Sequence, residues 1–238
     1  MPDGVANAYL SRPDDGSHPG VLFIMDAFGL RPTIEEMVDR IAADGYIVLA
    51  PNLFYRAGRS AMPPLPDLTD PEQRGRFFQS LRPFMEELTP ERIAADGAAY
   101  LDYLQGIAAS RPVAITGYCM GARVGWRIAA AHPDRVAALA GFHAGGLVTD
   151  APDSPHRSAG DLKAELYFGF ADNDRSMTPE QIAELERTLE EAGARYRSEV
   201  YEGAEHGYTM ADTAAYDEGA RERHFRDLGA LLQRTLHP

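Results

Sequence analysis

A single cysteine stands between two glycines, at a spacing that suits a nucleophile. The segment Gly117-Tyr118-Cys119-Met120-Gly121 has the Gly-x-nucleophile-x-Gly pattern of a nucleophile elbow, a sharp turn between a strand and a helix. Side chains at the two glycine positions would collide with the strained nucleophile and the neighbouring backbone. The turn places the thiol at a helix N-terminus, which favours a thiolate, and it offers the backbone N–H of Met120 to a developing oxyanion.

A lone cysteine can also be a buried apolar residue, so its surroundings in the chain must decide between the two interpretations. Cys119 follows an apolar run at 112–116 and precedes an amphipathic segment at 121–131, as an elbow requires. One cysteine permits neither an intrachain disulfide nor a multi-cysteine metal site. This context, together with two candidate partners later in the chain, favours the nucleophile.

Partners for the thiol should follow it in the order acid, then histidine. His206 lies in a loop between the last predicted strand and the last predicted helix, where a base belongs in this topology. The acid should follow the fifth predicted strand, where Asp172 and Asp174 both stand. We prefer Asp174, which immediately precedes the approach to a helix, and Asp172 stays open as the alternative. His143 follows the fourth predicted strand and fits either a pocket wall or an ordinary loop.

The elements that must position these residues alternate along the chain. Apolar runs predict strands at 20–25, 46–50, 112–116, 136–140, 162–170 and 197–201. Apolar residues at helical spacing predict helices at 31–45, 77–88, 93–104, 121–131, 178–193 and 216–236. Residues 57–70 and the proline that follows them predict an irregular surface excursion, and the pattern leaves open whether it is a lid.

Strands that alternate with helices predict an α/β fold, with a mostly parallel sheet between two layers of helices in a three-layer α/β/α sandwich. Residues 1–238 suit a single domain of this kind. Ligands of such sheets bind beyond the carboxyl ends of the strands. The candidate nucleophile, acids and histidine all follow predicted strands.

Composition limits the partners. The chain has 23 basic and 36 acidic residues, a formal charge of −13, and we find no basic patch. We therefore expect neither a nucleic acid nor an anionic membrane surface as a partner. No apolar run approaches the roughly 20 residues of a membrane span, and the first residues lack the pattern of a signal peptide. The expected location is the cytoplasm.

Three motifs together resemble the dienelactone hydrolase family, and the likeness runs from about residue 20 to the last helix. The elbow at 117–121 is similar to the family's Gly-Tyr-Cys-Leu-Gly. Asp26-Ala27-Phe28-Gly29 resembles the family's Glu-Ile-Phe-Gly segment, and Ala204-Glu205-His206-Gly207-Tyr208 resembles its Ala-Gly-His-Ser-Phe. The resemblance implies an α/β-hydrolase fold.

The resemblance also implies a mechanism. Cys119 would attack the carbonyl of a small ester or lactone, His206 would serve as base, and Asp174 would orient the imidazole. The backbone N–H groups of Ala27 and Met120 would bind the oxyanion. Water would then cleave a thioester intermediate, and the chemistry requires no metal or organic cofactor.

Departures from the family pattern concern the carboxylate beside the thiol and the cations that bind substrate. Asp26 stands where the family has a longer Glu that helps to take the thiol proton. Met210 replaces an Arg that pairs with the carboxylate of the family's substrate. The family's other carboxylate-binding Arg best matches Arg74, with Phe78 and Leu81 at the places of a Tyr and a Trp.

Together with Phe28, the residues Met210, Phe78 and Leu81 would give the substrate pocket a more apolar wall. This wall predicts that the substrate is a less anionic ester or lactone. Arg74 and the nearby Arg76 are equally compatible with solvated helix charges. Two other functions remain open: a non-catalytic or redox-responsive binding module, and an acyltransferase or thioesterase that uses the same elbow. The expected partner is a small-molecule substrate, and the expected state is a monomer or a small homo-oligomer.

Overall fold

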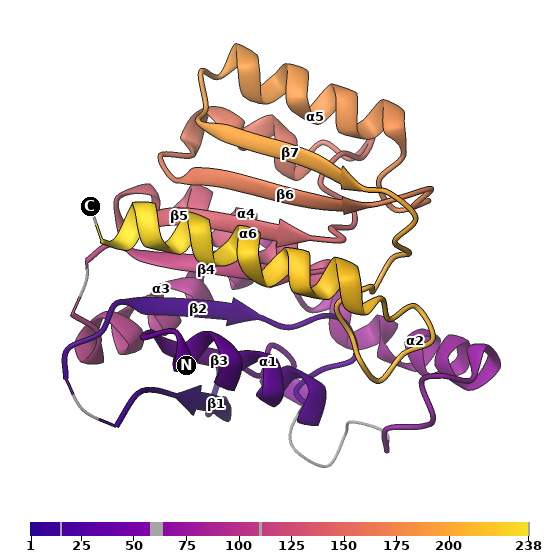
Figure 1. Ribbon diagram of the computed structural model, residues 1–238, viewed down its shortest axis with the longest axis horizontal. Helices are drawn as coiled ribbons and strands as arrows, with labels where there is room; N and C mark the ends of the chain where they lie inside the picture. The colour runs from indigo at the N-terminus through magenta and orange to yellow at the C-terminus, as the bar shows by residue number, and fades with distance from the viewer. Residues whose placement is uncertain (15, 58–63, 110, 238) are drawn as a thin grey trace.

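The computed structural model describes residues 1–14, 16–57, 64–109 and 111–237, and a seven-stranded sheet forms its centre (Figure 1). The strands are β1 (Ala8–Ser11), β2 (Gly20–Ile24), β3 (Ile47–Pro51), β4 (Val113–Tyr118), β5 (Val136–Phe142), β6 (Glu165–Ala171) and β7 (Tyr196–Tyr201). The helices are α1 (Pro32–Ala43), α2 (Pro71–Glu86), α3 (Pro90–Ile107), α4 (Met120–Ala131), α5 (Pro179–Glu191) and α6 (Glu218–Leu236). Short 3-10 helices cover Tyr55–Ala57, Pro133–Arg135 and Pro155–Asp161.

The strands follow the order β1-β3-β2-β4-β5-β6-β7 across the sheet. β1 pairs with β3 in the antiparallel direction, and every other neighbouring pair is parallel. The carboxyl ends of β2 to β7 therefore lie at one edge of the sheet. β4 is central, and its Gly117 pairs with Ile24 on one side and Gly141 on the other. The loop that follows β4 thus stands in the middle of the edge where ligands of parallel sheets bind.

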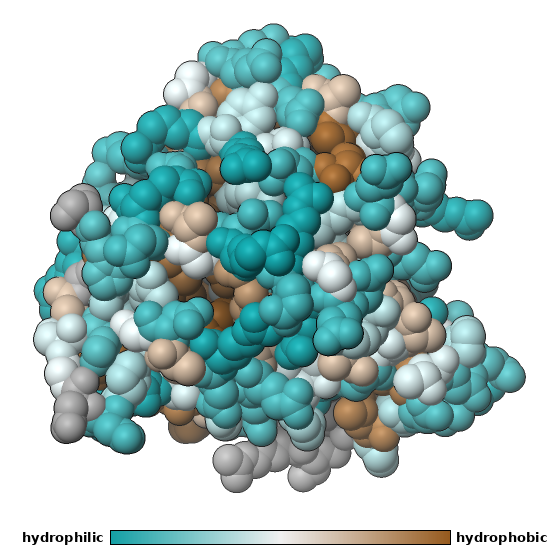
Figure 2. Space-filling view, in the orientation of Figure 1, coloured by the Kyte–Doolittle hydropathy of each residue, from teal (hydrophilic) through white to brown (hydrophobic). Residues whose placement is uncertain are grey.

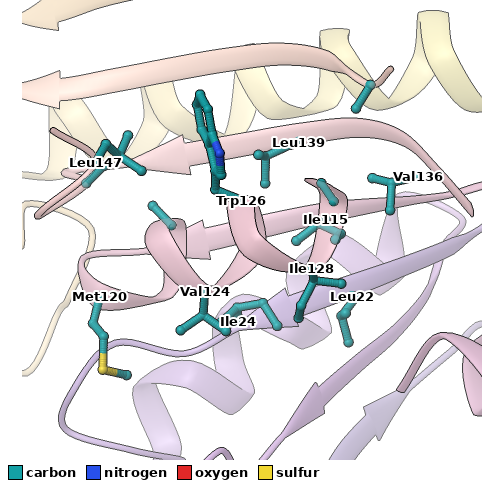
Figure 3. Packing of buried hydrophobic residues seen from close by; sticks show 14 of the residues in the cluster. Leu22, Ile24, Ile115, Met120, Val124, Trp126, Ile128, Val136, Leu139 and Leu147 are labelled. Carbon is teal, nitrogen blue, oxygen red and sulfur yellow. The ribbon is translucent and has the colours of Figure 1, made fainter. Parts of the chain in front are cut away.

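Two apolar cores cover the two faces of the sheet, because successive side chains of a strand point to opposite faces. In β2, Leu22 and Ile24 belong to the core that α3, α4 and α5 cover, and Val21 and Phe23 belong to the core beneath α1 and α6. Figure 3 shows the first core around α4. Each large side chain buried in this way contributes about 1.5–3 kcal/mol of transfer free energy. The predicted three-layer α/β/α architecture is confirmed.

Hydrophilic side chains cover most of the face that Figure 2 shows, and apolar residues come to the surface only in small areas. None of the helices in the described ranges is long and apolar enough to cross a membrane.

The two largest differences from the sequence-based expectation concern β1 and α2. β1 was not predicted, because a strand of four residues at the sheet edge, alternately exposed and half-buried, carries little apolar signal. α2 begins at Pro71 rather than at residue 77. Asp70 caps it by accepting hydrogen bonds from the backbone N–H groups of Glu72 and Gln73, and its buried residues, Phe77 and Leu81, lie near its middle, so its first turn carries no apolar signal. Of the predicted excursion, residues 58–63 lie outside the described residues.

Candidate active site

Cys119 occupies a strained turn between β4 and α4. Its backbone has φ 54° and ψ −118°, in the left-handed half of φ space that costs side-chain-bearing residues energy. The neighbouring glycines make the turn possible. A Cβ at Gly117 would lie 2.4 Å from the Gly121 carbonyl oxygen, and a Cβ at Gly121 would lie 2.4 Å from the Ile24 carbonyl oxygen. Gly117 and Gly121 therefore have the steric reason that the sequence pattern predicts.

The thiol faces a cavity of about 640 Å³ at the carboxyl edge of the sheet. Its walls come from the loop after β2, from α2, from the first turns of α4, and from the loops after β5, β6 and β7. Segments far apart in the sequence therefore converge on one side chain. A cavity of this size suits a small-molecule ligand.

His206, in the loop after β7, is paired with Asp174, in the loop after β6. Nδ1 of His206 lies 2.6 Å from Oδ2 of Asp174. Asp172 has a different task, because its Oδ2 accepts a hydrogen bond of 3.0 Å from the backbone N–H of Gly203. The structure thus places Asp174, and not Asp172, in hydrogen-bond contact with the imidazole.

The imidazole is strongly biased towards its protonated form. Burial opposes the charge, but the sulfur of Cys119, which also hydrogen-bonds the ring, and the carboxylate of Asp174 outweigh it and raise the pKa of His206 to about 10. Burial likewise opposes the ionisation of Asp174, yet its contacts with His206 and Ser176 keep its pKa below the usual value. His206 and Asp174 therefore favour an imidazolium beside a carboxylate, next to the sulfur of Cys119.

Ser176, which was not predicted from sequence, contacts both Asp174 and His206. Its hydroxyl donates a hydrogen bond of 2.6 Å to Oδ1 of Asp174, and its backbone N–H donates one of 2.8 Å to the same oxygen. The hydroxyl oxygen also lies 3.0 Å from Nδ1 of His206. Asp and Ser two positions apart form a common local turn, so the Asp174-Arg175-Ser176 sequence contained a signal for this contact.

Asp26 lines the cavity, but its carboxylate is held by Arg31. Nη1 and Nη2 of Arg31 donate to Oδ1 and Oδ2 of Asp26 at 2.7 and 3.0 Å, and the backbone N–H of Phe28 donates to Oδ1 at 3.0 Å. Arg31 also binds Asp212 through Nε, at 2.6 Å. Arg31 and Asp212 are not predictable from sequence, because no local pattern joins residues 181 positions apart.

Ala27 and Met120, the predicted oxyanion donors, both line the cavity with Cys119. Met120 is the first residue of α4, and backbone N–H groups in a first helical turn have no intrahelical acceptor. The closed geometry of the Asp26–Phe28 turn fixes the segment that carries Ala27. Both N–H groups are therefore on segments next to the thiol.

His143, for which the sequence left two interpretations open, forms part of the cavity wall. It is fully buried, and its Nε2 lies 2.8 Å from the hydroxyl oxygen of Thr209. Its ring meets that of His206 edge-on at 5.3 Å between centroids. Burial and then the charge of His206 keep the pKa of His143 well below its usual value, so this second histidine is neutral.

The predicted pocket residues divide into two groups. Phe28, Arg74, Phe78 and Met210 line the cavity. Leu81 does not, because it is fully buried in a separate small cluster beneath α2. The exposed Arg76 forms an ion pair with Glu72 on the same helix. Two further arginines, Arg123 and Arg175, line the cavity and were not predicted.

No group of three or more His, Cys, Asp or Glu side chains within the described ranges is arranged to hold a metal ion.

Comparisons with known proteins identify relatives of this chain. The model of the dienelactone hydrolase family matches residues 6–236. A carboxymethylenebutenolidase-like protein of Salmonella typhi is 28% identical over 224 residues, 90% of this chain and 77% of that protein. One of Synechocystis sp. is 26% identical over 235 residues, 96% of this chain and 91% of its own. A dienelactone hydrolase-like structure from Klebsiella pneumoniae has the same fold, with a TM-score of 0.83 at 23% identity over 96% of this chain and 93% of that one.

Proposed function

Since the chain belongs to the dienelactone hydrolase family and is a hydrolase, we propose that it cleaves a small ester or lactone with Cys119 as the nucleophile. The observation that carries this proposal is the row formed by Cys119, His206 and Asp174 at the edge of the cavity. A thiolate beside an imidazolium is the reactive form of a cysteine nucleophile.

In the first half of the reaction, the sulfur of Cys119 bonds to the carbonyl carbon, and the carbonyl electron pair moves onto oxygen. The resulting oxyanion accepts hydrogen bonds from the N–H groups of Ala27 and Met120. As the intermediate collapses, the C–O bond to the leaving alkoxide breaks, and His206 gives that oxygen its proton. A thioester on Cys119 and a neutral His206 remain.

In the second half, His206 takes a proton from a water molecule as the water attacks the thioester carbonyl. The C–S bond then breaks, the carboxylic acid leaves, and the thiolate and imidazolium are restored. Asp174 fixes the orientation of the ring and stabilises its positive charge, and the hydroxyl of Ser176 holds Asp174 in place. In a lactone, the released alcohol stays attached to the acid.

The contacts of Asp26 favour a supporting role over the proton transfer from the thiol that the resemblance gives to the family's Glu at this position. Both of its oxygens accept hydrogen bonds from Arg31, which therefore occupies lone pairs that a proton from the thiol would need. Together with the hydrogen bond from Phe28, this pair holds the turn that presents Ala27. We therefore assign Asp26 to the geometry of the oxyanion site.

Initial rates on a short p-nitrophenyl ester, with the thiol kept reduced, test the proposal. We expect Cys119→Ala and His206→Ala each to lower kcat/KM by at least about 10³-fold, because nucleophile and base act as a unit. His237→Ala, at an exposed position near the C-terminus, is the matched control and should keep the wild-type rate. Circular dichroism checks that each variant is folded.

Near-wild-type activity in Cys119→Ala or in His206→Ala would contradict the proposal. Absence of turnover in the wild type, with slow peroxide oxidation of Cys119 as its only reaction, would support a redox-responsive module instead. A product that changes from acid to new ester when an alcohol is added would support an acyltransferase.

A further inference from the structure

Arg123 lies on the cavity wall, four residues after Cys119. Arg123 is in the first turn of α4, which Cys119 immediately precedes, and both residues line the cavity. The guanidinium also borders the loop after β5, because a Cβ at Gly146 would stand 3.6 Å from Nη1 of Arg123. The wall that α4 and this loop form therefore carries a positive charge close to the thiol.

This cation has no anionic partner in the described part of the chain. Arg123 is half-buried, yet no hydrogen bond or ion pair joins it to another described residue. The carboxylate of Asp153 attracts it only at longer range, and that carboxylate is bound by Arg127 at 3.0 Å. The pKa of Arg123 is lowered, because burial and the neighbouring Arg127 outweigh the opposite effect of the Cys119 sulfur.

Two well-buried arginines show what Arg123 lacks. Arg31, whose side chain is 2% exposed, lies between Asp26 and Asp212. Arg56, whose side chain is 11% exposed, lies between Asp3 and Asp96. Charges removed from water are normally paired, because an unpaired one costs desolvation energy without a Coulomb gain. A half-buried cation left open on a substrate cavity is thus suited to an anion brought by the substrate.

We propose that Arg123 is a specificity-determining residue of the cavity and binds a carboxylate on the substrate, as in a half-ester of a dicarboxylic acid. The inference rests on the proposed function, because it assigns the acyl chain of the ester that Cys119 attacks. A guanidinium takes a carboxylate through two parallel hydrogen bonds, which fixes position as well as charge.

Arg123 changes the substrate charge that the sequence predicts. Met210, Phe28 and Phe78 do line the cavity and predict a less anionic substrate. Arg123 supplies a cation on α4, away from the loop of Met210. A substrate with an apolar body and one carboxylate satisfies both observations.

Paired substrates test the proposal. The mono-p-nitrophenyl ester of glutaric acid carries a carboxylate, and its methyl-capped diester has the same chain without the charge. We expect Arg123→Met to lower the ratio of kcat/KM for the two esters, acid over diester, by about 10- to 100-fold. The loss should fall mainly on KM of the acid. Arg123→Lys should retain part of the preference.

Arg127→Met is the matched control, because Arg127 lies one turn further along α4, pairs with Asp153 and does not line the cavity. It should leave the ratio unchanged. An unchanged ratio in Arg123→Met would overturn the proposal. An equal fall of kcat for both esters would also overturn it, because Arg123 would then stabilise the thiolate instead of binding the substrate carboxylate.

Alkylation of Cys119 separates a failure of this site from a failure of the proposed function. Cys119 is the only cysteine, so the intact mass reports its reaction with iodoacetate or with neutral iodoacetamide. We expect Arg123→Met to lower the preference for iodoacetate over iodoacetamide relative to the wild type. If this preference depends on Arg123 while neither ester is cleaved, the proposed function fails and the anion site stands. If the esters are cleaved and neither preference depends on Arg123, the anion site alone fails.

Discussion

Two buried carboxylates line the same cavity, and they differ in the partner that each one holds. Asp174 lies 2.6 Å from an imidazole nitrogen of His206, and Asp26 binds Arg31 through both of its oxygens. Histidine changes its charge near neutral pH, whereas arginine stays protonated. The first pair can therefore support proton transfer, and the second pair supplies a fixed charge and a fixed shape.

The two partners give the two aspartates different roles: Asp174 supports proton transfer by His206, and Asp26 stabilises the local structure. Burial alone does not distinguish the carboxylates, since Asp26 is 3% exposed and Asp174 is 8% exposed. What distinguishes them is whether the partner can lose its proton during the reaction. We accordingly expect substitutions of the first pair to affect kcat and substitutions of the second pair to affect stability first.

The largest expected effect is that of Asp174→Asn. The change removes the negative charge that holds the imidazolium, so kcat should fall by about 10³- to 10⁴-fold. The pKa of His206, followed by NMR, should fall with it. Asp172→Asn is the matched control, because Asp172 contacts the Gly203 backbone instead of the ring. Equal losses in the two variants would remove the distinction between these aspartates.

Arg31→Met tests the second pair. The change leaves Asp26 buried without its cation, and we expect the free energy of unfolding to fall by about 3–5 kcal/mol. Asp26→Asn should cost less, about 1–3 kcal/mol, because Arg31 keeps Asp212. Urea unfolding measures both. If Asp26→Asn instead keeps full stability and lowers kcat more than about 100-fold, Asp26 takes the thiol proton after all.

Ser176→Ala sharpens the account of the first pair. Oδ1 of Asp174 would lose the hydroxyl but keep the backbone N–H of residue 176, so we expect a loss in kcat of about 10-fold. Ser176→Thr should restore most of it. Because the hydroxyl also lies near Nδ1 of His206, the pH profile of kcat should shift in the alanine variant. An unshifted profile with normal kcat would leave Ser176 a purely local turn residue.

The smallest effect concerns stability at alkaline pH. The pKa of His206 is raised in the folded state, to about 10, so the stabilisation is complete below the unfolded value of about 6.5 and is lost as the pH rises towards 10. A shift of this size would correspond to about 5 kcal/mol. Because the His206 side chain is 32% exposed and solvent screens its charge, we expect a decline on the order of 1 kcal/mol across that window, which His206→Ala should lack. Thermal unfolding measured at steps of pH would show it. A parallel decline in the alanine variant would assign it to other groups.

The parts of the molecule that could be predicted from sequence are those with a local pattern. The elbow around Cys119 needs two glycines at fixed spacing, and the buried parallel strands are continuous apolar runs. His206 and the pair of aspartates follow from their places after strands. The edge strand β1 has neither feature, and it was missed.

The remaining site residues depend on contacts across the fold. Arg31 meets Asp212 because the loops after β2 and β7 lie at the same edge of the sheet, which no spacing in the chain expresses. Arg123 lies on an amphipathic helix, where a charged residue is ordinary. Only the folded structure shows that it lines the cavity. Leu81, expected at the cavity from the family resemblance, instead lies in a separate cluster.

The most direct test of Cys119 as the nucleophile is the intact mass of the protein during turnover of p-nitrophenyl acetate. A cysteine nucleophile predicts one acetyl adduct that maps to Cys119, forms with the burst of p-nitrophenol, and disappears as substrate is exhausted. Cys119→Ala should show neither the adduct nor the burst. Steady hydrolysis in Cys119→Ala at the wild-type rate, with no adduct on the wild type, would contradict it.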